Sequence, residues 1–551
     1  MRLLYRRLYL RRLALLALAV TSLITTVHHL LIDLRTLDLD LFRSPTVPIL
    51  DDPEGVWSEH PVAILHRRAE KKFEDLLRRQ SKTADEAESE YTRRYARQPP
   101  PGFRQWVENA LKHASPIIDD FDTIADGVHR YHNLSAAEIE RRMHGALADN
   151  AGMARNDRVA RCRLSGGEFD AGCRHFAKPL TDLLGSARSL APDVDFLVNF
   201  LDEPSVLMGN NGADDAGVPE WEDLSHQPLA GALAEACRVR GNTTAKQVGE
   251  TADAHGFPFI QDIAAAKDLC LHTEYNSLHG FLMCPATMKR MKTDVPILSQ
   301  AAPYPFSDIL YPSTHYGLKS SLYRQSQDRA WSRKKNAAYW TGSSTGGFWS
   351  SETWPRGHRQ RLAAIGLKKH DRNYTFLRPS TVAGEDVQSY TSAEFDTSLF
   401  NVGLTRVVGC TEETVCEEQR TYFGLPRPLD SELEVYRYRF VLDIDGNSYS
   451  GRFYRFLASR SVPLKISIFR EWHDERLVPW LHYVPVSPTI EELPELMRFL
   501  ATTSEGQRIS RRIAEAGREW YFRAMTPVHH GIYLYRLMLE LAWIQNTTRQ
   551  G

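Results

Sequence analysis

The stretch Tyr436–Val486, YRYRFVLDIDGNSYSGRFYRFLASRSVPLKISIFREWHDERLVPWLHYVPV, decides the fold class. Its apolar run Phe440–Leu442 predicts a strand, the glycines and serines that follow predict a turn, and a helical pattern begins at Arg452. A second predicted strand, Val462–Ile466, completes a β-turn-α-β unit. Free backbone N–H groups at a helix start, with an arginine in the first turn, favour binding of a diphosphate at residues 450–452.

Strands and helices alternate over most of the remaining chain. Further strands are predicted at Val194–Phe200 and Ala337–Trp340, with helical patterns between them. This alternation predicts an α/β protein with parallel sheets. The 551 residues exceed one typical core, and the hydrophobic content of 42% is that of an ordinary globular protein, so we expect two domains.

The charge of the chain is balanced, with 68 basic and 69 acidic residues and a net charge of −1. No basic stripe is interleaved with aromatic residues. The composition therefore excludes the usual electrostatic signature of a nucleic-acid partner, and a small or neutral acceptor fits better.

The N-terminus predicts attachment to a membrane. Arginines in residues 1–12 precede the uncharged run Leu13–Val27, which extends to Ile32. By the positive-inside rule, we expect a cytosolic tail (1–12) followed by a signal anchor (13–32). Residues 33–59 are expected to form a stem, and the charged helical pattern that follows predicts a helical extension (60–110). The body would then be lumenal, in a single-pass type II protein of the Golgi or endoplasmic reticulum. A cleaved signal peptide is the alternative.

Seven cysteines lie in no zinc-binding spacing, so in an oxidising lumen some should form disulfides. The local pairs Cys410–Cys416 and Cys162–Cys173 are our predictions. Four N-x-[ST] sequons are compatible with a lumenal body, at Asn133, Asn242, Asn373 and Asn546.

Asp202 is the candidate general base. It follows the predicted strand 194–200 in the sequence LDEP, and Pro204 keeps the preceding residue out of the helical region. Ligands bind at the carboxyl ends of strands in open α/β sheets, where a carboxylate could take a proton from a hydroxyl group. A helix-capping role is the alternative. Glu203 should point away from Asp202, so the two do not form a glycosidase pair.

The segment Ala337–Gly347, AAYWTGSSTGG, is a second candidate site. Small residues allow backbone amides to approach a ligand closely, and hydroxyl groups add donors. The segment lacks GK[ST], which excludes a nucleotide triphosphatase loop. A plain strand-to-helix turn is the alternative. The candidate binding residues here are Ser343, Ser344, Thr345 and Gly346.

Asp443 and Asp445 form a DxD pair that could hold a divalent metal. Arg452 and backbone amides could instead neutralise a diphosphate without metal, and we predict no metal and no other cofactor. Glu471, just beyond a strand, could hold ribose or sugar hydroxyls, with a structural turn as the alternative. Asp308 and Tyr311 are possible acceptor or sugar contacts, with core packing as the alternative for the tyrosine.

The order DxDG, SGRF, REW, PW and HYVPV, together with PDVDFLVNFLDEP, resembles the capsule-associated glycosyltransferases, glycosyltransferase family 90. This family includes protein O-glucosyltransferases and fungal xylosyltransferases. The resemblance covers roughly residues 60–540. It implies a GT-B architecture of two Rossmann-like domains facing a cleft. The acceptor and base domain would span 111–325, the donor domain 326–525 and a C-terminal helix 526–551.

The resemblance also implies an inverting glycosyltransferase. Asp202 would be the base, and Ser343–Gly347 with Ser450, Gly451 and Arg452 would bind a UDP-sugar. Xylose is favoured as the sugar because the DEP wording is similar to the fungal branch, with glucose next, and the acceptor would be a glycan or a glycoprotein. Thr341 and Ser344 stand where arginines occur in the family. The alternatives are a non-catalytic lumenal glycan-binding protein of the same fold and a metal-dependent DxD-type glycosyltransferase.

Overall fold

The computed structural model describes residues 60–148, 158–208, 219–239, 257–317, 321–367, 369, 373–379, 387–426 and 430–546. The predicted cytosolic tail, signal anchor and stem lie outside these residues, as does the sequon at Asn242. Within the described ranges, no helix combines the length and apolar character needed to span a bilayer.

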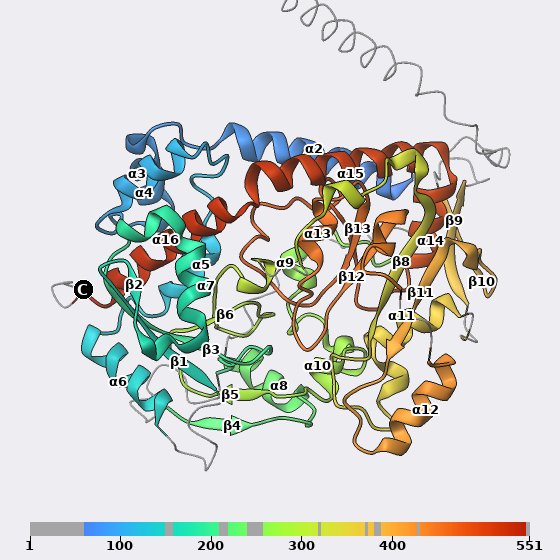
Figure 1. Cartoon of the computed structure of the whole chain (residues 1–551), viewed down its shortest axis with the longest axis horizontal. Helices are drawn as coiled ribbons and strands as arrows, with labels where there is room; N and C mark the ends of the chain where they lie inside the picture. The colour runs from blue at the N-terminus through green and yellow to red at the C-terminus, as the bar shows by residue number, and fades with distance from the viewer. Residues whose placement is uncertain are drawn as a thin grey trace, which may run out of the picture. The chain divides into compact units, whose positions relative to one another are not determined.

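One sheet consists of five parallel strands in the order β11-β8-β12-β13-β14 (Figure 1). The chain runs from β8 to β11 on one side and then passes to β12 on the other, so the switch point lies between β8 and β12. Ligands bind at such switch points in doubly wound sheets. The strands are β8 (Lys335–Ser343), β11 (Phe400–Arg406), β12 (Tyr438–Ile444), β13 (Val462–Ile466) and β14 (Val484–Val486).

The second five-stranded sheet is mixed, in the order β2-β1-β3-β6-β7. β1 is antiparallel to β2 and β3, whereas β3, β6 and β7 are parallel. The parallel pairing expected from the sequence is found for β3, β6 and β7 but not for β1. Gly166 and Gly167, both with positive φ, turn the chain from β1 into β2 in a hairpin. The α/β class is confirmed. The strands are β1 (Val159–Ser165), β2 (Glu168–Phe169), β3 (Val194–Asn199), β6 (Ile297–Ser299) and β7 (Ile309–Leu310).

Two antiparallel pairs, fifteen α-helices and nine short 3-10 helices complete the described chain. The pairs are β4 (Trp221–Asp223) with β5 (Lys289–Met291) and β9 (Tyr374–Pro379) with β10 (Val387–Ser392). The helices before β8 are α2 (Pro61–Arg78), α3 (Ala84–Tyr95), α4 (Phe103–Lys112), α5 (Asp122–His129), α6 (Ala136–Leu147), α7 (Ala177–Leu184), α8 (Ala230–Val239), α9 (Ile263–Ala266) and α10 (Gly280–Met283). Those after it are α11 (His358–Gly366), α12 (Glu413–Phe423), α13 (Phe453–Leu457), α14 (Leu493–Thr502), α15 (Ser504–Ala524) and α16 (Pro527–Ile544).

The last two helices divide at Thr526-Pro527, and α16 returns to the first half of the chain. It packs against α4, α5, α7 and β3. Trp106 Nε1 donates to Ile532 O at 2.8 Å, and Tyr533 Oη donates to Leu310 O at 3.2 Å. Thr526 occupies the N-cap position of α16 and Pro527 its first position. The Thr526 hydroxyl makes no capping hydrogen bond and lies 2.8 Å from His529 Nδ1.

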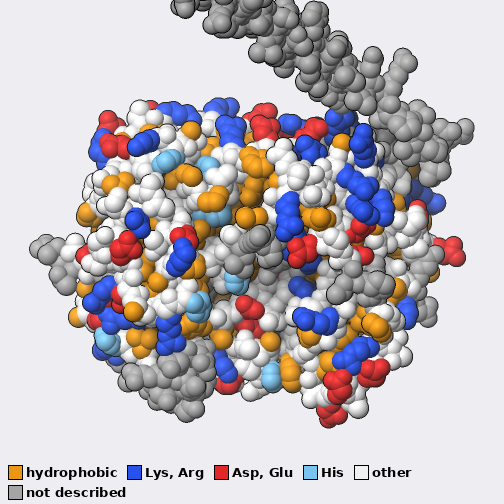
Figure 2. Space-filling view, in the orientation of Figure 1, with side chains coloured by type: hydrophobic (Ala, Val, Ile, Leu, Met, Phe, Trp, Pro, Cys, Tyr) orange, Lys and Arg blue, Asp and Glu red, His pale blue; other side chains and the backbone are white. Residues whose placement is uncertain are grey.

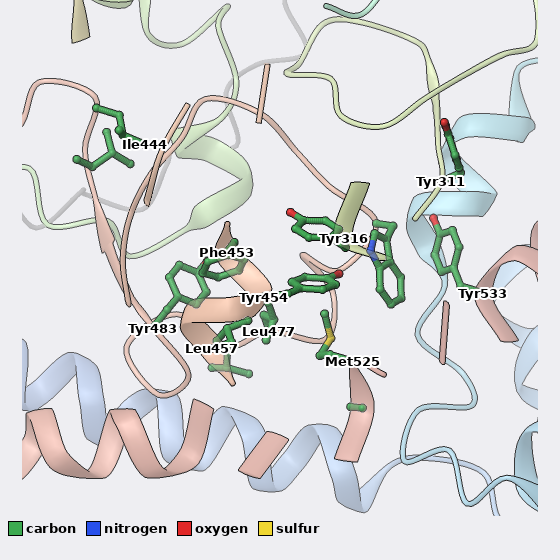
Figure 3. Packing of buried hydrophobic residues seen from close by; sticks show 14 of the residues in the cluster. Tyr311, Tyr316, Ile444, Phe453, Tyr454, Leu457, Leu477, Tyr483, Met525 and Tyr533 are labelled. Carbon is green, nitrogen blue, oxygen red and sulfur yellow. The ribbon is translucent and has the colours of Figure 1, made fainter. Parts of the chain in front are cut away.

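Aromatic residues fill the core behind α13 (Figure 3). The rings of Tyr316 and Tyr454 stack with their centroids 3.7 Å apart, and Phe453 packs edge-on against Tyr483. Tyr316 precedes β8 and Tyr454 belongs to α13, so this stack connects segments that lie far apart in the sequence. The turn after β12 is therefore supported from behind by a close-packed layer.

The two predicted disulfides, Cys410–Cys416 and Cys162–Cys173, are confirmed. A third, Cys237–Cys270, joins α8 to the segment after α9. Cys284 is buried and has no disulfide partner among the described residues.

Candidate functional site

A cavity of about 410 Å³ lies where the turns after β3, β8 and β12 meet. Figure 2 shows acidic, basic and histidine side chains around a hollow near the middle of the face in view. The cavity collects side chains from both five-stranded sheets. Its lining residues are Asp202, His315, Gly342, Ser343, Thr345, Arg359, Gly446, Asn447, Ser448, Tyr449, Ser450, Gly451 and Arg452.

Asp202 reaches this cavity from the turn after β3, and the local sequence explains why. Asn199 fixes the turn: its Nδ2 donates to Glu203 O at 2.7 Å, and its Oδ1 accepts from Leu201 N at 2.9 Å. The next side chain, Glu203, turns inward and accepts from Thr287 N and Oγ1 at 3.0 and 2.6 Å. Asp202 is thus exposed to the cavity while its neighbour is buried.

Arg452 brings a cation to the same cavity from the turn after β12. Its Nη1 donates to Thr341 O at 2.9 Å, and its guanidinium lies against the Trp340 ring. Burial lowers the pKa of Arg452, while the carboxylate of Asp443 acts in the raising direction. The helix that follows, α13, has only five residues, so its dipole is small and the arginine itself is the main positive charge.

Arg359 supplies a second cation that the sequence argument missed. Its Nε donates to Asp445 O at 2.6 Å, and its Nη1 donates to Ser343 O at 3.0 Å and to Thr345 Oγ1 at 2.6 Å. Burial, followed by the charge of Arg452, lowers the pKa of Arg359 to about 9. The available signal was the basic segment HRQRL of α11, which follows the Gly/Ser turn by more than ten residues and carries no turn motif of its own.

Neither arginine forms an ion pair with a carboxylate in the part of the chain that is described. Burying a charge is costly unless an opposite charge compensates it. Two neighbouring guanidinium groups, held by backbone carbonyls and facing one cavity, therefore form a preorganised site for an anion. Their planar fork geometry suits phosphate oxygens.

Five of the predicted binding residues do not line the cavity. Ser344 is buried and exchanges hydrogen bonds with the backbone of Val408 at 2.8 and 2.9 Å, and Gly346 donates its N–H to Asn447 Oδ1 at 3.1 Å. These two residues shape the turn rather than its surface. The other three, Glu471, Asp308 and Tyr311, are buried away from the cavity surface.

Glu471 lies behind the wall of the cavity, 3.1 Å from Lys465 Nζ, and accepts from Tyr316 Oη. Burial raises the pKa of Glu471, and the Lys465 charge opposes that shift. Asp308 is also buried and accepts from Ser205 N and Val206 N, both at 2.8 Å, so it fixes the segment after Asp202. Tyr311 is fully buried. The contacts of Glu471 and Asp308 explain why these two carboxylates do not line the cavity.

The DxD carboxylates are buried as well and do not line the cavity. Asp443 Oδ2 lies 3.2 Å from Lys465 Nζ. Asp445 Oδ2 accepts from Ile468 N at 2.9 Å and lies 3.4 Å from His279 Nε2. Among the residues whose positions are described, no group of three or more His, Cys, Asp or Glu side chains is arranged to hold a metal ion.

Two polar side chains that the sequence analysis did not single out also line the cavity. Tyr449 Oη donates to Gln300 Oε1 at 2.8 Å and lies 3.3 Å from His315 Nδ1. Tyr449 and His315 line the cavity together with Asp202.

A second cavity, of about 190 Å³, shares Arg452 with the first. Aromatic side chains of Tyr339, Trp340 and Phe456 line it together with Asp430 and Glu432. Arg452 thus lines both cavities: the first contains the carboxylate of Asp202, and the second contains aromatic rings and acidic side chains.

Part of the chain is similar in sequence to a known protein family. Residues 425–550 match the sequence profile described as Glycosyl transferase family 90, which confirms the resemblance over that segment. The chain is 38% identical over 99 residues to a protein named O-glucosyltransferase rumi homolog from Anopheles gambiae, and the alignment covers 17% of this chain and 24% of that protein. It is 36% identical over 86 residues to a protein of the same name from Aedes aegypti, with 15% and 21% covered. The chain thus spans about a quarter of the length of the curated relatives it matches.

Proposed function

We propose that this chain is an inverting glycosyltransferase that moves a sugar from a UDP-sugar to an acceptor hydroxyl. One observation carries the proposal: Asp202 and the arginines Arg359 and Arg452 line the same cavity of about 410 Å³. Such a transfer requires a base and an anion site within one cavity. The family match and the names of the two relatives support the same reaction class.

The donor would lie across the two cavities that meet at Arg452. Its diphosphate would occupy the site formed by Arg359, Arg452 and the hydroxyl groups of Ser343, Thr345 and Ser450. The sugar would point toward Asp202. The nucleoside would extend into the smaller cavity, where aromatic rings can pack on the base and Asp430 or Glu432 can accept ribose hydroxyls.

Asp202 removes the proton from the acceptor hydroxyl as that oxygen attacks the anomeric carbon. The bond from the anomeric carbon to the diphosphate breaks, and its electron pair leaves with UDP. The two arginines stabilise the charge that develops on the leaving group. Attack opposite an α-linked UDP gives a β-linked product.

We infer that this transfer needs no metal ion, because two fixed cations already face the leaving group. We also infer a GT-B arrangement, in which each five-stranded sheet contributes one side of the cavity. The three disulfides support a body in the secretory lumen, and the expected signal anchor would attach it to the Golgi or endoplasmic reticulum membrane.

The sugar is either glucose or xylose in this proposal. The names of the relatives favour glucose, whereas the DEP wording of the base segment favours xylose. A glycan or a glycoprotein would provide the acceptor hydroxyl.

The test is a panel of radiolabelled UDP-sugars incubated with the purified full chain, scored for hydrolysis and for transfer to glycans and glycoproteins. We expect release of UDP from UDP-glucose or UDP-xylose and from few other donors. Sugar binding without turnover of any donor would instead support a non-catalytic glycan-binding protein.

A further inference from the structure

We propose that Asn447 is a positioning residue that orients Asp202 and connects it to the donor-binding turn after β8. This inference rests on the proposed function, since it assigns a role within the same reaction. Asn447 lies in the turn after β12 and lines the same cavity as Asp202 and the two arginines. Neither its sequence position nor the DxD pattern next to it predicts such a role.

The side chain of Asn447 accepts one hydrogen bond and donates another. Its Oδ1 accepts from Gly346 N at 3.1 Å, and its Nδ2 donates to Asp202 Oδ2 at 3.4 Å. A backbone N–H can only donate, so the amide oxygen must face Gly346. The amide NH₂ group is thereby directed at the carboxylate of Asp202.

Asp202 depends on this contact for its orientation. Within the described ranges, no other hydrogen bond or ion pair involves its carboxylate. The side chain is exposed to the cavity and could otherwise rotate freely. A general base must hold its oxygen within hydrogen-bond reach of the reacting hydroxyl, so a fixed rotamer of Asp202 favours the reaction.

The other end of the connection is rigid. Gly346 has a φ of +113°, and an added Cβ there would lie 2.5 Å from the His358 ring and 2.8 Å from Gly446 O. The adjacent Thr345 accepts from Arg359, which faces the anion site. Asn447 therefore ties the base to the same turn that holds the donor.

The two oxygens of Asp202 acquire different tasks through this contact. The amide donates to Oδ2, which leaves Oδ1 for the acceptor hydroxyl. Asn447 does not exchange a proton itself, so it acts through Asp202 rather than on the substrate.

The test uses kcat at saturating donor, measured from pH 4.5 to 8.5 with the UDP-sugar that the wild-type chain turns over. Asn447→Asp retains an acceptor for Gly346 N but replaces the donor by a second carboxylate next to Asp202. Neighbouring carboxylates disfavour one another's ionisation. We therefore expect kcat at pH 6 to fall at least about tenfold, and the acid limb of the plot of kcat against pH to move up by about one pH unit.

Two further variants complete the experiment. Asn447→Ala removes the hydrogen bond without adding charge, so we expect about a tenfold lower kcat and an acid limb close to that of the wild type. Gln105→Glu adds one negative charge on the exposed side of α4 and should change neither quantity.

The outcomes separate the two proposals. The positioning role alone would be overturned if the wild-type chain turns over a UDP-sugar and both Asn447 variants keep the wild-type kcat and the wild-type acid limb. A merely structural role would lower the melting temperature without moving the acid limb of Asn447→Asp, which also overturns it. A wild-type chain that turns over no donor overturns the proposed function and this inference together.

Discussion

The ammonium group of Lys465 lies 3.2 Å from Asp443 Oδ2, and both side chains are almost fully buried. Burial alone would lower the pKa of Lys465, but the carboxylates of Glu471 and Asp443 raise it above its ordinary value. Lysine therefore stays charged and neutralises the first carboxylate of the DIDG sequence. The pair stabilises the turn after β12 from behind the cavity.

Replacing Lys465 by methionine should destabilise the protein strongly, because it leaves Asp443 and Glu471 buried without a cation. Breaking a buried ion pair from one side typically costs about 3–5 kcal/mol. Chemical denaturation of Lys465→Met measures this loss. The control is Lys335→Met, which removes an exposed lysine of β8 and should cost no more than about 1 kcal/mol. Equal effects of the two variants would show that Lys465 has no special structural role.

Exhaustive treatment with EDTA should leave sugar transfer unchanged. Arg359 and Arg452 already provide fixed positive charge at the anion site, and Asp443 is occupied by Lys465. The measurement is the transfer rate before and after chelation, with added Mn²⁺ and Mg²⁺ as controls. Loss of transfer that manganese alone restores would instead establish a metal-dependent DxD-type mechanism.

Removing either buried arginine should weaken UDP binding at least about tenfold, because hydrogen bonds to charged groups contribute roughly 1.5–3 kcal/mol. Calorimetry on Arg359→Ala and Arg452→Ala measures this loss. Lysine at either position should give intermediate affinity, since it keeps the charge but not the planar fork. Arg333→Ala, an exposed arginine outside the cavity, is the control. Unchanged affinity in an alanine variant would remove that arginine from the donor site.

Strands of both five-stranded sheets could be predicted from the sequence, because they are short apolar runs separated by turn residues. The predicted strand Val462–Ile466 has the same bounds in the structure, and Val194–Phe200 differs by one residue. Asp202, Ser450 and Arg452 were predicted from the turns that follow predicted strands, and they do line the cavity. Local patterns are reliable here because each of these residues lies within a few positions of a strand end.

Contacts between distant segments could not be predicted. Arg359 enters the site from α11, which only the packed fold brings next to the ends of β8 and β12. Glu471 and Asp308 were placed near the site correctly along the chain, but their side chains turn toward Lys465 and the backbone of residues 205 and 206. A motif gives the position of a residue and not the direction of its side chain.

A buried carboxyl group gives the protein a pH-dependent stability. Burial raises the pKa of Glu492 to about 7, above the ordinary value of 4.5, although hydrogen bonds from Ser487 act in the opposite direction. The native state thus holds a proton that the unfolded state has lost between pH 4.5 and 7. The stabilisation is complete below pH 4.5 and is lost as the pH rises through about 7.

Glu492→Gln should therefore gain stability relative to the wild type as the pH rises from 4.5 to 7, by at most about 1.4 kcal/mol for each pH unit. Urea unfolding at several pH values measures the difference. Glu491→Gln, at the exposed neighbouring position, is the matched control and should show no such trend. A difference between Glu492→Gln and the wild type that does not change with pH would contradict the assignment.

The most direct test of the account is the transfer rate of Asp202→Asn, measured together with its affinity for UDP. Asp182→Asn, an exposed aspartate of α7, serves as the control. If Asp202 is the general base beside an independent anion site, the rate falls about 10²–10⁴-fold while UDP affinity stays near that of the wild type. Transfer at a rate close to wild type in Asp202→Asn would contradict the central claim.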